Sequence, residues 1–224
     1  MKFLIKEAIS TDTVYAQAIV DEIAASAKER GTGIAKRTPE YIIQKITEGK
    51  AVVAKTTDGV WAGFCYIEAW GHGDFVANSG LIVAEQFRGH GLAKQIKEEI
   101  FNLSRKKYPE AKIFGLTTGS AVMKINSSLG YKPVVYADLT TDEAFWKGCQ
   151  SCVNYEILQS KERKGCICTA MLYNPMWEKD QKPKRKKWRN RELDKDLKLF
   201  ERWTRFKKTV LLKTKKTKND HGEK

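Results

Sequence analysis

The sequence predicts a mixed α/β (α+β) domain, in which helices flank an open sheet. Two observations lead to this prediction. Segments with the 3.6-residue period of helices alternate with short β-branched runs, and turn signals such as Asp58-Gly59 separate the runs. The chain has 224 residues, of which 42% are hydrophobic, so it is long enough for one ordinary domain and an appendage.

The first expected elements are a strand at residues 2–8, a helix from Asp12 to Arg30, and a helix that starts at Thr38-Pro39. Threonine is a favoured N-cap residue, and proline suits the first helical position. The remaining expected elements are strands at 51–54, 60–67 and 75–83, a helix at 92–106, a strand at 112–116, a helix at 121–129, and strands at 131–136 and 166–173. Such an order is typical of one α+β or mixed α/β domain.

The positive charge of the chain lies at its C-terminal end. Residues 178–224 hold 19 of the 41 Lys and Arg residues but only 8 of the 27 Asp and Glu residues, so their net charge is +11. Residues 1–177 carry the remaining +3 of the formal +14. We therefore expect three parts: a globular domain at 1–140, a Cys-rich extension at 141–177 that completes the sheet, and a basic amphipathic tail at 178–224.

The tail joins basic residues to a helical apolar pattern. Its apolar residues recur at Leu193, Leu197, Phe200, Trp203 and Phe206. Basic residues with interleaved aromatics can bind the phosphates and bases of nucleic acid, or lie on an anionic membrane. We favour a third interpretation, in which the apolar stripe docks on the chain's own domain or on a second subunit, which would make a homodimer.

Composition also bears on location. No apolar run approaches the roughly 20 residues that cross a bilayer, so the sequence predicts no membrane span. Glu7 follows Met1 too closely for a signal-peptide core to develop between them. The sequence therefore indicates a cytoplasmic protein, in which the five cysteines are not a disulfide framework.

The strongest functional signal lies between the strand at 75–83 and the helix at 92–106. Gly89 and Gly91 precede the helix, where exposed backbone N–H groups and the helix dipole favour a bound anion such as a pyrophosphate. Glycine also lets the backbone approach a ligand closely. An ordinary strand-to-helix turn can contain the same glycines, so the surrounding pattern has to decide.

That pattern resembles a known family. Arg88-x-x-Gly91-x-Ala93 matches the Arg/Gln-x-x-Gly-x-Gly/Ala signature of the GNAT superfamily of N-acetyltransferases, and Leu81-Ile82-Val83 matches its preceding strand. The resemblance covers roughly residues 2–136, and it is nearest to the stand-alone N-acylglutamate synthase-like members. It implies a mixed sheet with two splayed strands, and transfer of an acyl group from acetyl-CoA or another acyl-CoA. The residues it implies for coenzyme A binding are Leu81, Ile82, Val83, Arg88, Gly89, His90, Gly91, Leu92 and Ala93.

The reaction needs a base, because an amine attacks a thioester only after its ammonium has lost a proton. Glu68 is the first candidate, and His72 and Asp74 follow it. As an alternative, each of the three is a solvated residue at a strand end or turn.

The leaving thiolate needs a proton. Many members of the superfamily supply it from a tyrosine in the late helix, but this chain has Asn126 at that position. The resemblance therefore leaves three sources open: a hydrogen bond from Asn126, one from Ser127 or Ser128, or a proton from water.

Four cysteines form two close pairs. Cys149-x-x-Cys152 and Cys166-x-Cys168 supply the four thiols that a structural tetrahedral zinc ion requires. Because Cys166 and Cys168 stand two apart on an expected strand, both should point to one face. An apolar cluster with neighbouring aromatic residues is the alternative.

These observations favour an N-acyltransferase that acts on a primary amine of a small molecule, such as the α-amino group of an amino acid like glutamate. One alternative is an acetyltransferase that modifies protein or nucleic acid, guided by the basic tail. Another is a coenzyme A-binding regulator without turnover, which the absent tyrosine would permit.

Overall fold

The computed structural model describes residues 2–30 and 37–179. The chain divides at Pro175 into two units, and the first, Met1–Pro175, holds every strand described here. The second unit, Met176–Lys224, contributes the short helix α7 (Met176–Lys179). Our predictions for the apolar stripe and the basic tail lie outside the described residues.

The described part of the first unit is built on a seven-stranded sheet in the order β1-β2-β3-β4-β5-β7-β6. Only β4 and β5 pair in parallel, and all other neighbours are antiparallel, so the predicted mixed sheet is confirmed. The strands are β1 (Phe3–Glu7), β2 (Ala51–Thr56), β3 (Trp61–Trp70), β4 (Phe75–Val83), β5 (Lys112–Thr117), β6 (Lys132–Val134) and β7 (Thr169–Tyr173).

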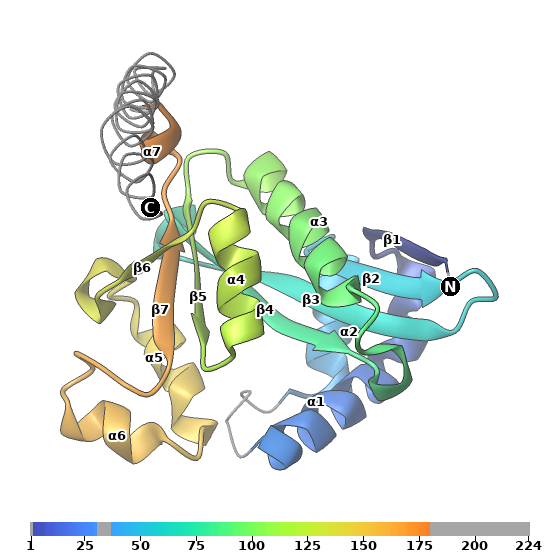
Figure 1. Ribbon diagram of the computed structural model, residues 1–224, viewed down its shortest axis with the longest axis horizontal. Helices are drawn as coiled ribbons and strands as arrows, with labels where there is room; N and C mark the ends of the chain where they lie inside the picture. The colour runs from blue at the N-terminus through green and yellow to red at the C-terminus, as the bar shows by residue number, and fades with distance from the viewer. Residues whose placement is uncertain (1, 31–36, 180–224) are drawn as a thin grey trace, which may run out of the picture. The chain divides into compact units, whose positions relative to one another are not determined.

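Helices cover both faces of this sheet, with α3 on one side of the strands and α1 on the other (Figure 1). Longer helices alternate with short 3₁₀ helices, named η. In chain order they are η1 (Ser10–Tyr15), α1 (Ala16–Arg30), α2 (Pro39–Thr47), η2 (Gly71–Gly73), η3 (Glu85–Phe87), α3 (Leu92–Lys107), α4 (Ser120–Ser128), η4 (Tyr136–Asp138), α5 (Glu143–Gly148), η5 (Cys149–Ser151) and α6 (Tyr155–Ser160).

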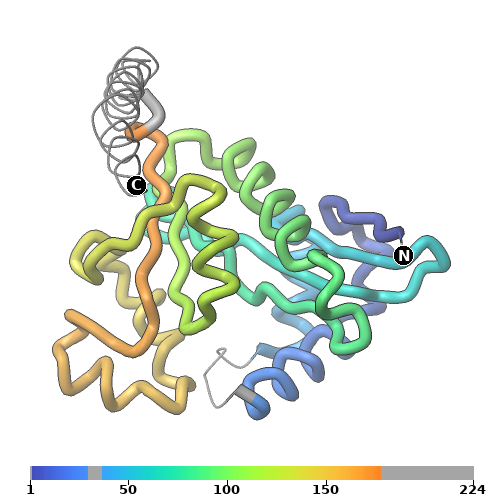
Figure 2. Tube along the Cα trace, viewed as in Figure 1, coloured from blue at the N-terminus to red at the C-terminus, as the bar shows by residue number. Residues whose placement is uncertain are grey.

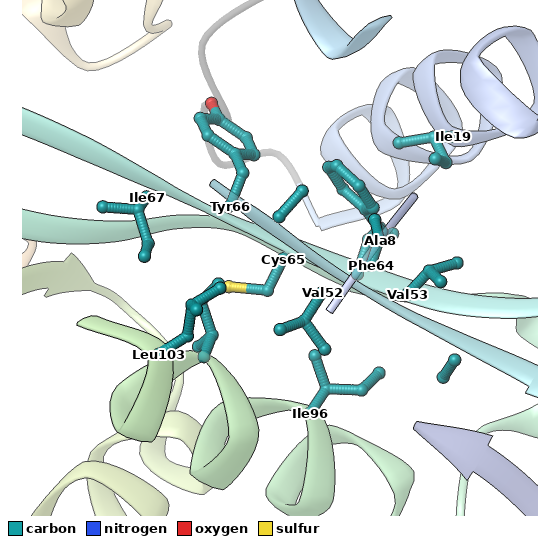
Figure 3. Packing of buried hydrophobic residues seen from close by; sticks show 14 of the residues in the cluster. Ala8, Ile19, Val52, Val53, Phe64, Cys65, Tyr66, Ile67, Ile96 and Leu103 are labelled. Carbon is teal, nitrogen blue, oxygen red and sulfur yellow. The ribbon is translucent and has the colours of Figure 1, made fainter. Parts of the chain in front are cut away.

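The core forms where the two faces of β2 and β3 meet these helices. Figure 3 shows Cys65 on the side of α3 and Tyr66 on the opposite side, toward α1. Alternate residues of a strand point to opposite faces, so β3, buried on both, reads as an almost continuous apolar run. In the part of the chain that the structure describes, no helix has both the length and the apolar character needed to cross a membrane.

The start of α2 is confirmed at the predicted cap. The Thr38 side chain accepts a hydrogen bond from the Tyr41 N–H at 3.3 Å, and Pro39 occupies the first helical position. The cap fixes Tyr41 in the first turn of the helix, from which its hydroxyl reaches Glu68.

The predicted start of the first long helix is wrong. Asp12 lies in η1, and α1 begins only at Ala16. The Asp12 carboxylate accepts a hydrogen bond from the Ile9 N–H at 3.0 Å and pairs with Lys55 Nζ at 2.7 Å. This local bonding favours a tight 3₁₀ turn over an α-helix here.

Two predicted strands are also too long. The segment at 131–136 is a strand only over 132–134, because Tyr136 turns into η4 and its hydroxyl donates to the Cys168 carbonyl at 2.8 Å. The segment at 166–173 is a strand only from Thr169, where pairing with β5 begins. Cys166 and Cys168 therefore lie before β7, and the strand alternation that was to place both thiols on one face does not apply to them.

Between β6 and β7 the chain leaves the sheet. Figure 2 traces this excursion through the yellow α5 and α6 segments and back along the orange β7, which inserts between β5 and β6. The Cys-containing residues lie on this excursion.

We predict that Asp12→Asn lowers the free energy of unfolding by about 1–3 kcal/mol at neutral pH, because the variant lacks the buried carboxylate that pairs with the Lys55 ammonium. Burial acts to raise the pKa of Asp12, but the Ile9 N–H and the Lys55 ammonium outweigh it and hold the pKa below 3.8. The stability that ionised Asp12 contributes is therefore fully present above pH 3.8, and it is lost as the pH falls through the pKa of Asp12 in the folded state. Urea unfolding at several pH values tests this, with the exposed Asp21→Asn as control.

Candidate active site

The site begins where the two parallel strands separate. β4 and β5 pair only from Phe75 to Ala77 against Lys112 to Phe114. Both strands continue, but the described residues form no further ladder between them. An opening between two strands exposes main-chain N–H and C=O groups that need partners, so it can accept an extended ligand. The predicted splay is therefore present.

A β-bulge lies beside this opening. Tyr66 pairs with Ser79 and Phe64 with Ile82, so one residue of β3 faces both Gly80 and Leu81 of β4. Gly80 has φ +65°, and a Cβ atom there would overlap the Tyr66 ring. Only glycine fits this position without displacing the ring.

A cavity of about 330 Å³ follows the bulge and the splay. This size suits a small ligand or one end of a longer ligand. The lining joins the two strands to polar side chains from the helices and to the excursion between β6 and β7. Its charged and polar members include Arg37, Glu68, Asn78, Lys97, Asn126, Cys149, Cys152, Cys166 and Cys168.

The predicted base, Glu68, sits in a hydrogen-bonded cluster in this cavity. Its Oε1 accepts from the Tyr41 hydroxyl and lies 3.4 Å from Arg37 Nη2. The Arg37 Nε donates in turn to the Tyr66 hydroxyl at 2.7 Å. Burial raises the pKa of both phenols, so Tyr41 and Tyr66 stay neutral. The cluster holds the Glu68 carboxylate in one orientation.

The two other candidate bases lie elsewhere. His72 belongs to η2, where its φ is +55°, and Asp74 caps the same short helix with an N–H to the Gly71 carbonyl. Neither is among the described residues that line the cavity. Of the three candidates, the structure brings only Glu68 to the cavity.

Asn126 also reaches the cavity, and it is almost fully buried. Its Nδ2 donates to the Met171 sulfur at 3.8 Å, while no described residue donates to its Oδ1. A buried amide oxygen without a partner is costly, so this atom is suited to a hydrogen-bond donor on a ligand.

The predicted phosphate loop is open to a ligand. Gly89 and Gly91 have φ +82° and +72°, and no atom lies within 4 Å of a Cβ built on either one. Leu92 and Ala93 begin the 16-residue α3. Arg88 points to α1, where its guanidinium lies 2.7 Å from Glu22 and 3.1 Å from Glu29. Its side chain therefore braces the loop. The Arg88 N–H itself donates to the Glu85 carbonyl at 3.1 Å, so the amides left for an anion are those that follow Arg88.

The side chains of the other residues predicted to bind coenzyme A differ in their exposure to solvent. His90 is exposed, and its Nδ1 lies 3.0 Å from the Arg88 carbonyl. Leu81 lines the cavity, whereas the Ile82 side chain packs in the core and Val83 is half-buried. The Ile82 side chain is therefore closed to a ligand, and the Val83 carbonyl accepts a hydrogen bond from Arg88 Nε at 3.4 Å.

The four cysteines come together at the cavity wall. Burial is the main cause of the raised pKa of Tyr136, and all four cysteines add to this rise. Burial, with help from neighbouring thiols, raises the pKa of Cys149 to about 11 and that of Cys168 to about 12. In the described residues, however, no three or more His, Cys, Asp or Glu side chains are arranged to hold a metal ion. The structure therefore gives no support to the zinc prediction.

Sequence reasoning missed several polar residues of the cavity. Arg37 lies just before the Thr38 cap, and no periodic pattern or motif around it in the sequence indicated a site. Tyr66 was part of an apolar strand run. Lys97 offered a signal, because it and Ser104 are seven residues apart on the apolar face of α3.

No protein-family model matches the sequence. No curated protein sequence matches it either. Solved structures do match, among them N-acetylglutamate synthase from Neisseria gonorrhoeae complexed with coenzyme A and N-acetyl-glutamate. The two chains are 16% identical with a TM-score of 0.55, and the match covers 78% of this chain but 35% of the synthase.

Two further similar structures are covered over most of their length. Phosphinothricin acetyltransferase from Sinorhizobium meliloti, a GNAT protein in complex with AcCoA, is 14% identical with a TM-score of 0.53, and the match covers 78% of this chain and 89% of that one. A Mycobacterium tuberculosis protein in complex with CoA and NLQ is 17% identical with a TM-score of 0.53, and the match covers 76% of this chain and 98% of that one. The fold of this chain is therefore that of the GNAT superfamily.

We predict that Gly91→Val raises the Kd for coenzyme A at least tenfold, or about 1.4 kcal/mol, because the added side chain occupies the space above the loop amides. Calorimetry measures this Kd. The matched control is Gly59→Val, which also places a β-branched residue at positive φ in open space but lies at the β2–β3 turn. Equal coenzyme A affinity in the two variants would remove Gly91 from the binding site.

Proposed function

We propose that this protein is an acyl-CoA-dependent N-acyltransferase, with acetyl-CoA as the expected donor and a primary amine as the acceptor. One observation carries the proposal: the chain leads from the bulge at Gly80, through the end of β4 and the short η3, to the open loop at Gly89 and Gly91. The loop amides would bind the pyrophosphate, and the unpaired edge at Leu81–Val83 would pair with the pantetheine. The thioester would then lie in the cavity.

Glu68 is the proposed base. It would take a proton from the acceptor ammonium, directly or through one water molecule. The neutral nitrogen then attacks the thioester carbonyl, the C–N bond forms, and negative charge develops on the carbonyl oxygen. A main-chain N–H at the β4 bulge would stabilise this oxyanion. Tyr41 and Arg37 hold the carboxylate in place during these steps.

We propose the α-amino group of an amino acid, glutamate among the candidates, as the acceptor. An amino acid presents a carboxylate beside its amine, and Arg37 supplies a cation in the same cavity as Glu68. The similar solved structures include one with bound N-acetyl-glutamate and one acetyltransferase named for phosphinothricin. Activity on protein or nucleic acid, or coenzyme A binding without turnover, are the outcomes that would replace this proposal.

We predict that Glu68→Gln lowers kcat about 100-fold or more, because the amide cannot accept the proton. Its Kd for coenzyme A should stay within twofold of the wild-type value, since Glu68 is remote from the loop. Free-thiol release with acetyl- and succinyl-CoA against amino acids and polyamines measures turnover. Glu98→Gln, which removes a surface carboxylate paired with Lys94, is the control. Full activity in Glu68→Gln would exclude this residue as the base.

We also propose a structural zinc ion for Cys149, Cys152, Cys166 and Cys168 in a reducing cytoplasm. The proposal rests on the ligand count of the two close cysteine pairs and on the position of all four cysteines in the wall of one cavity. Because no described group is arranged to hold a metal, the sulfur atoms would have to move together on binding, and the thiols would release protons.

If zinc binds there, protein purified without chelators contains about one zinc per chain and melts at a lower temperature after chelation. Elemental analysis and thermal unfolding measure the two effects. Cys149→Ser with Cys168→Ser should abolish the metal, whereas Cys65→Ala, which changes a buried core thiol, should keep it. Metal-free protein of unchanged stability would contradict the zinc proposal.

A further inference from the structure

A buried lysine lies in the wall of the cavity. Lys97 projects from α3, and its side chain is almost completely buried. Its Nζ donates to Asn78 Oδ1 at 3.1 Å and lies 5.2 Å from the centre of the Tyr131 ring. No described carboxylate forms an ion pair with it.

The groups around Lys97 hold it in place but do not balance its charge. Asn78 Oδ1 also accepts from the Tyr131 hydroxyl at 3.0 Å, and Asn78 Nδ2 donates to Ser104 Oγ at 2.7 Å. Asn78 is thereby fixed as an acceptor for the lysine. An ammonium has three donors, and only one is used by a described residue. The others can serve a ligand in the cavity.

Burial lowers the pKa of Lys97 to about 8, and Cys65 on β3 opposes this shift. The other titratable group that faces the ammonium is Tyr131, whose own pKa burial raises well above 10. Both of these neighbours are neutral near pH 8, because burial raises the pKa of Cys65 to about 11. Lys97 is therefore an acid that can give up its proton near neutral pH.

We infer that Lys97 donates the proton to the departing thiolate of the acyl-CoA substrate, in the role that Asn126 cannot fill. The inference rests on the proposed acyl transfer. As the tetrahedral intermediate collapses, the C–S bond breaks and its electron pair goes to sulfur. A proton passes from Lys97 Nζ to that sulfur, which leaves a neutral amine and free coenzyme A thiol. The acceptor nitrogen, which is cationic after its attack, loses its remaining extra proton to solvent as the amide forms, and the lysine regains a proton from solvent.

Asn126, Cys65 and Glu68 are less suited to this step. Asn126 carries an amide, which does not lose a proton at any ordinary pH. Cys65 packs in the core and directs its thiol to the Ser79 carbonyl at 3.3 Å. Glu68 belongs to the cluster with Tyr41, and α2 lies on the face of the sheet opposite to α3. Lys97 is the acid that the α3 side of the cavity provides among the described residues.

The first test measures an equilibrium, without turnover. Free coenzyme A thiol bound to the protein is titrated by its ultraviolet thiolate absorbance. A neighbouring ammonium should lower the thiol pKa by about one unit relative to thiol in water, and Lys97→Met should remove that shift. Lys94→Met, on the exposed side of the same helix, should retain it. Methionine fills a similar volume without a charge, so the variant is expected to fold.

The second test uses the pH dependence of turnover. If Lys97 must be protonated, wild-type kcat falls as the pH rises through its pKa near 8. In Lys97→Met this descending limb should disappear, with kcat reduced about 100-fold at pH 7 and coenzyme A affinity within threefold of wild type. A purely structural lysine would change affinity or stability and leave the limb in place.

The outcomes separate this inference from the proposed function. In one outcome, wild-type protein releases no thiol with any amine but still lowers the pKa of the bound thiol. This result would overturn the proposed function and would still support a contact between Lys97 and the coenzyme A sulfur. Active wild type with an equally active Lys97→Met variant, and the same thiol pKa in both, would overturn the role of Lys97.

Discussion

The contact between Tyr66 and Gly80 determines the geometry of the site. The Tyr66 ring occupies the volume that a side chain at residue 80 would need, so only glycine fits there, and this glycine takes the left-handed conformation with φ +65°. The register against β3 shifts here, and the following residue, Leu81, lines the cavity. Tyr66 is itself fixed, because Arg37 donates to its hydroxyl and Tyr41 packs edge-on against its ring. The bulge is thus tied to the cluster that holds Glu68.

The two groups proposed for proton transfer, Glu68 and Lys97, lie on opposite faces of the sheet in different electrostatic surroundings. Glu68 has a cation, Arg37, and a neutral phenol as partners, so its negative charge is compensated. Lys97 has an amide and an aromatic ring, so burial works against its positive charge. A carboxylate held beside a cation and a buried ammonium without a paired carboxylate are the different surroundings in which one fold can hold a base and an acid. The splay between β4 and β5 joins both faces in one cavity.

The order of helices and strands was predictable because hydrophobic period and turn chemistry are local. The Thr38 cap, the Asp58-Gly59 turn and the loop before α3 follow from residues close in sequence. Element ends were less predictable, since tertiary bonds such as Asp12 to Lys55 decide them. The site was found only in part. Glu68 and Asn126 came from resemblance, but the partners of Glu68 are 27 and 31 residues away, and no local pattern joins them.

The excursion between β6 and β7 has a role that the family resemblance could not assign, because that resemblance ends near residue 136. The excursion returns to the sheet as β7, which pairs with β5 on one side and β6 on the other. Among the described residues, β6 has no other strand neighbour. On the way it supplies Phe145, Leu158 and the four cysteines to the cavity wall. The proposed chemistry depends on β3, β4, α2 and α3, whereas this wall adds apolar and thiol surface beside them. Changes in this segment would therefore alter the wall of the cavity and leave the proposed catalytic groups Glu68 and Lys97 in place.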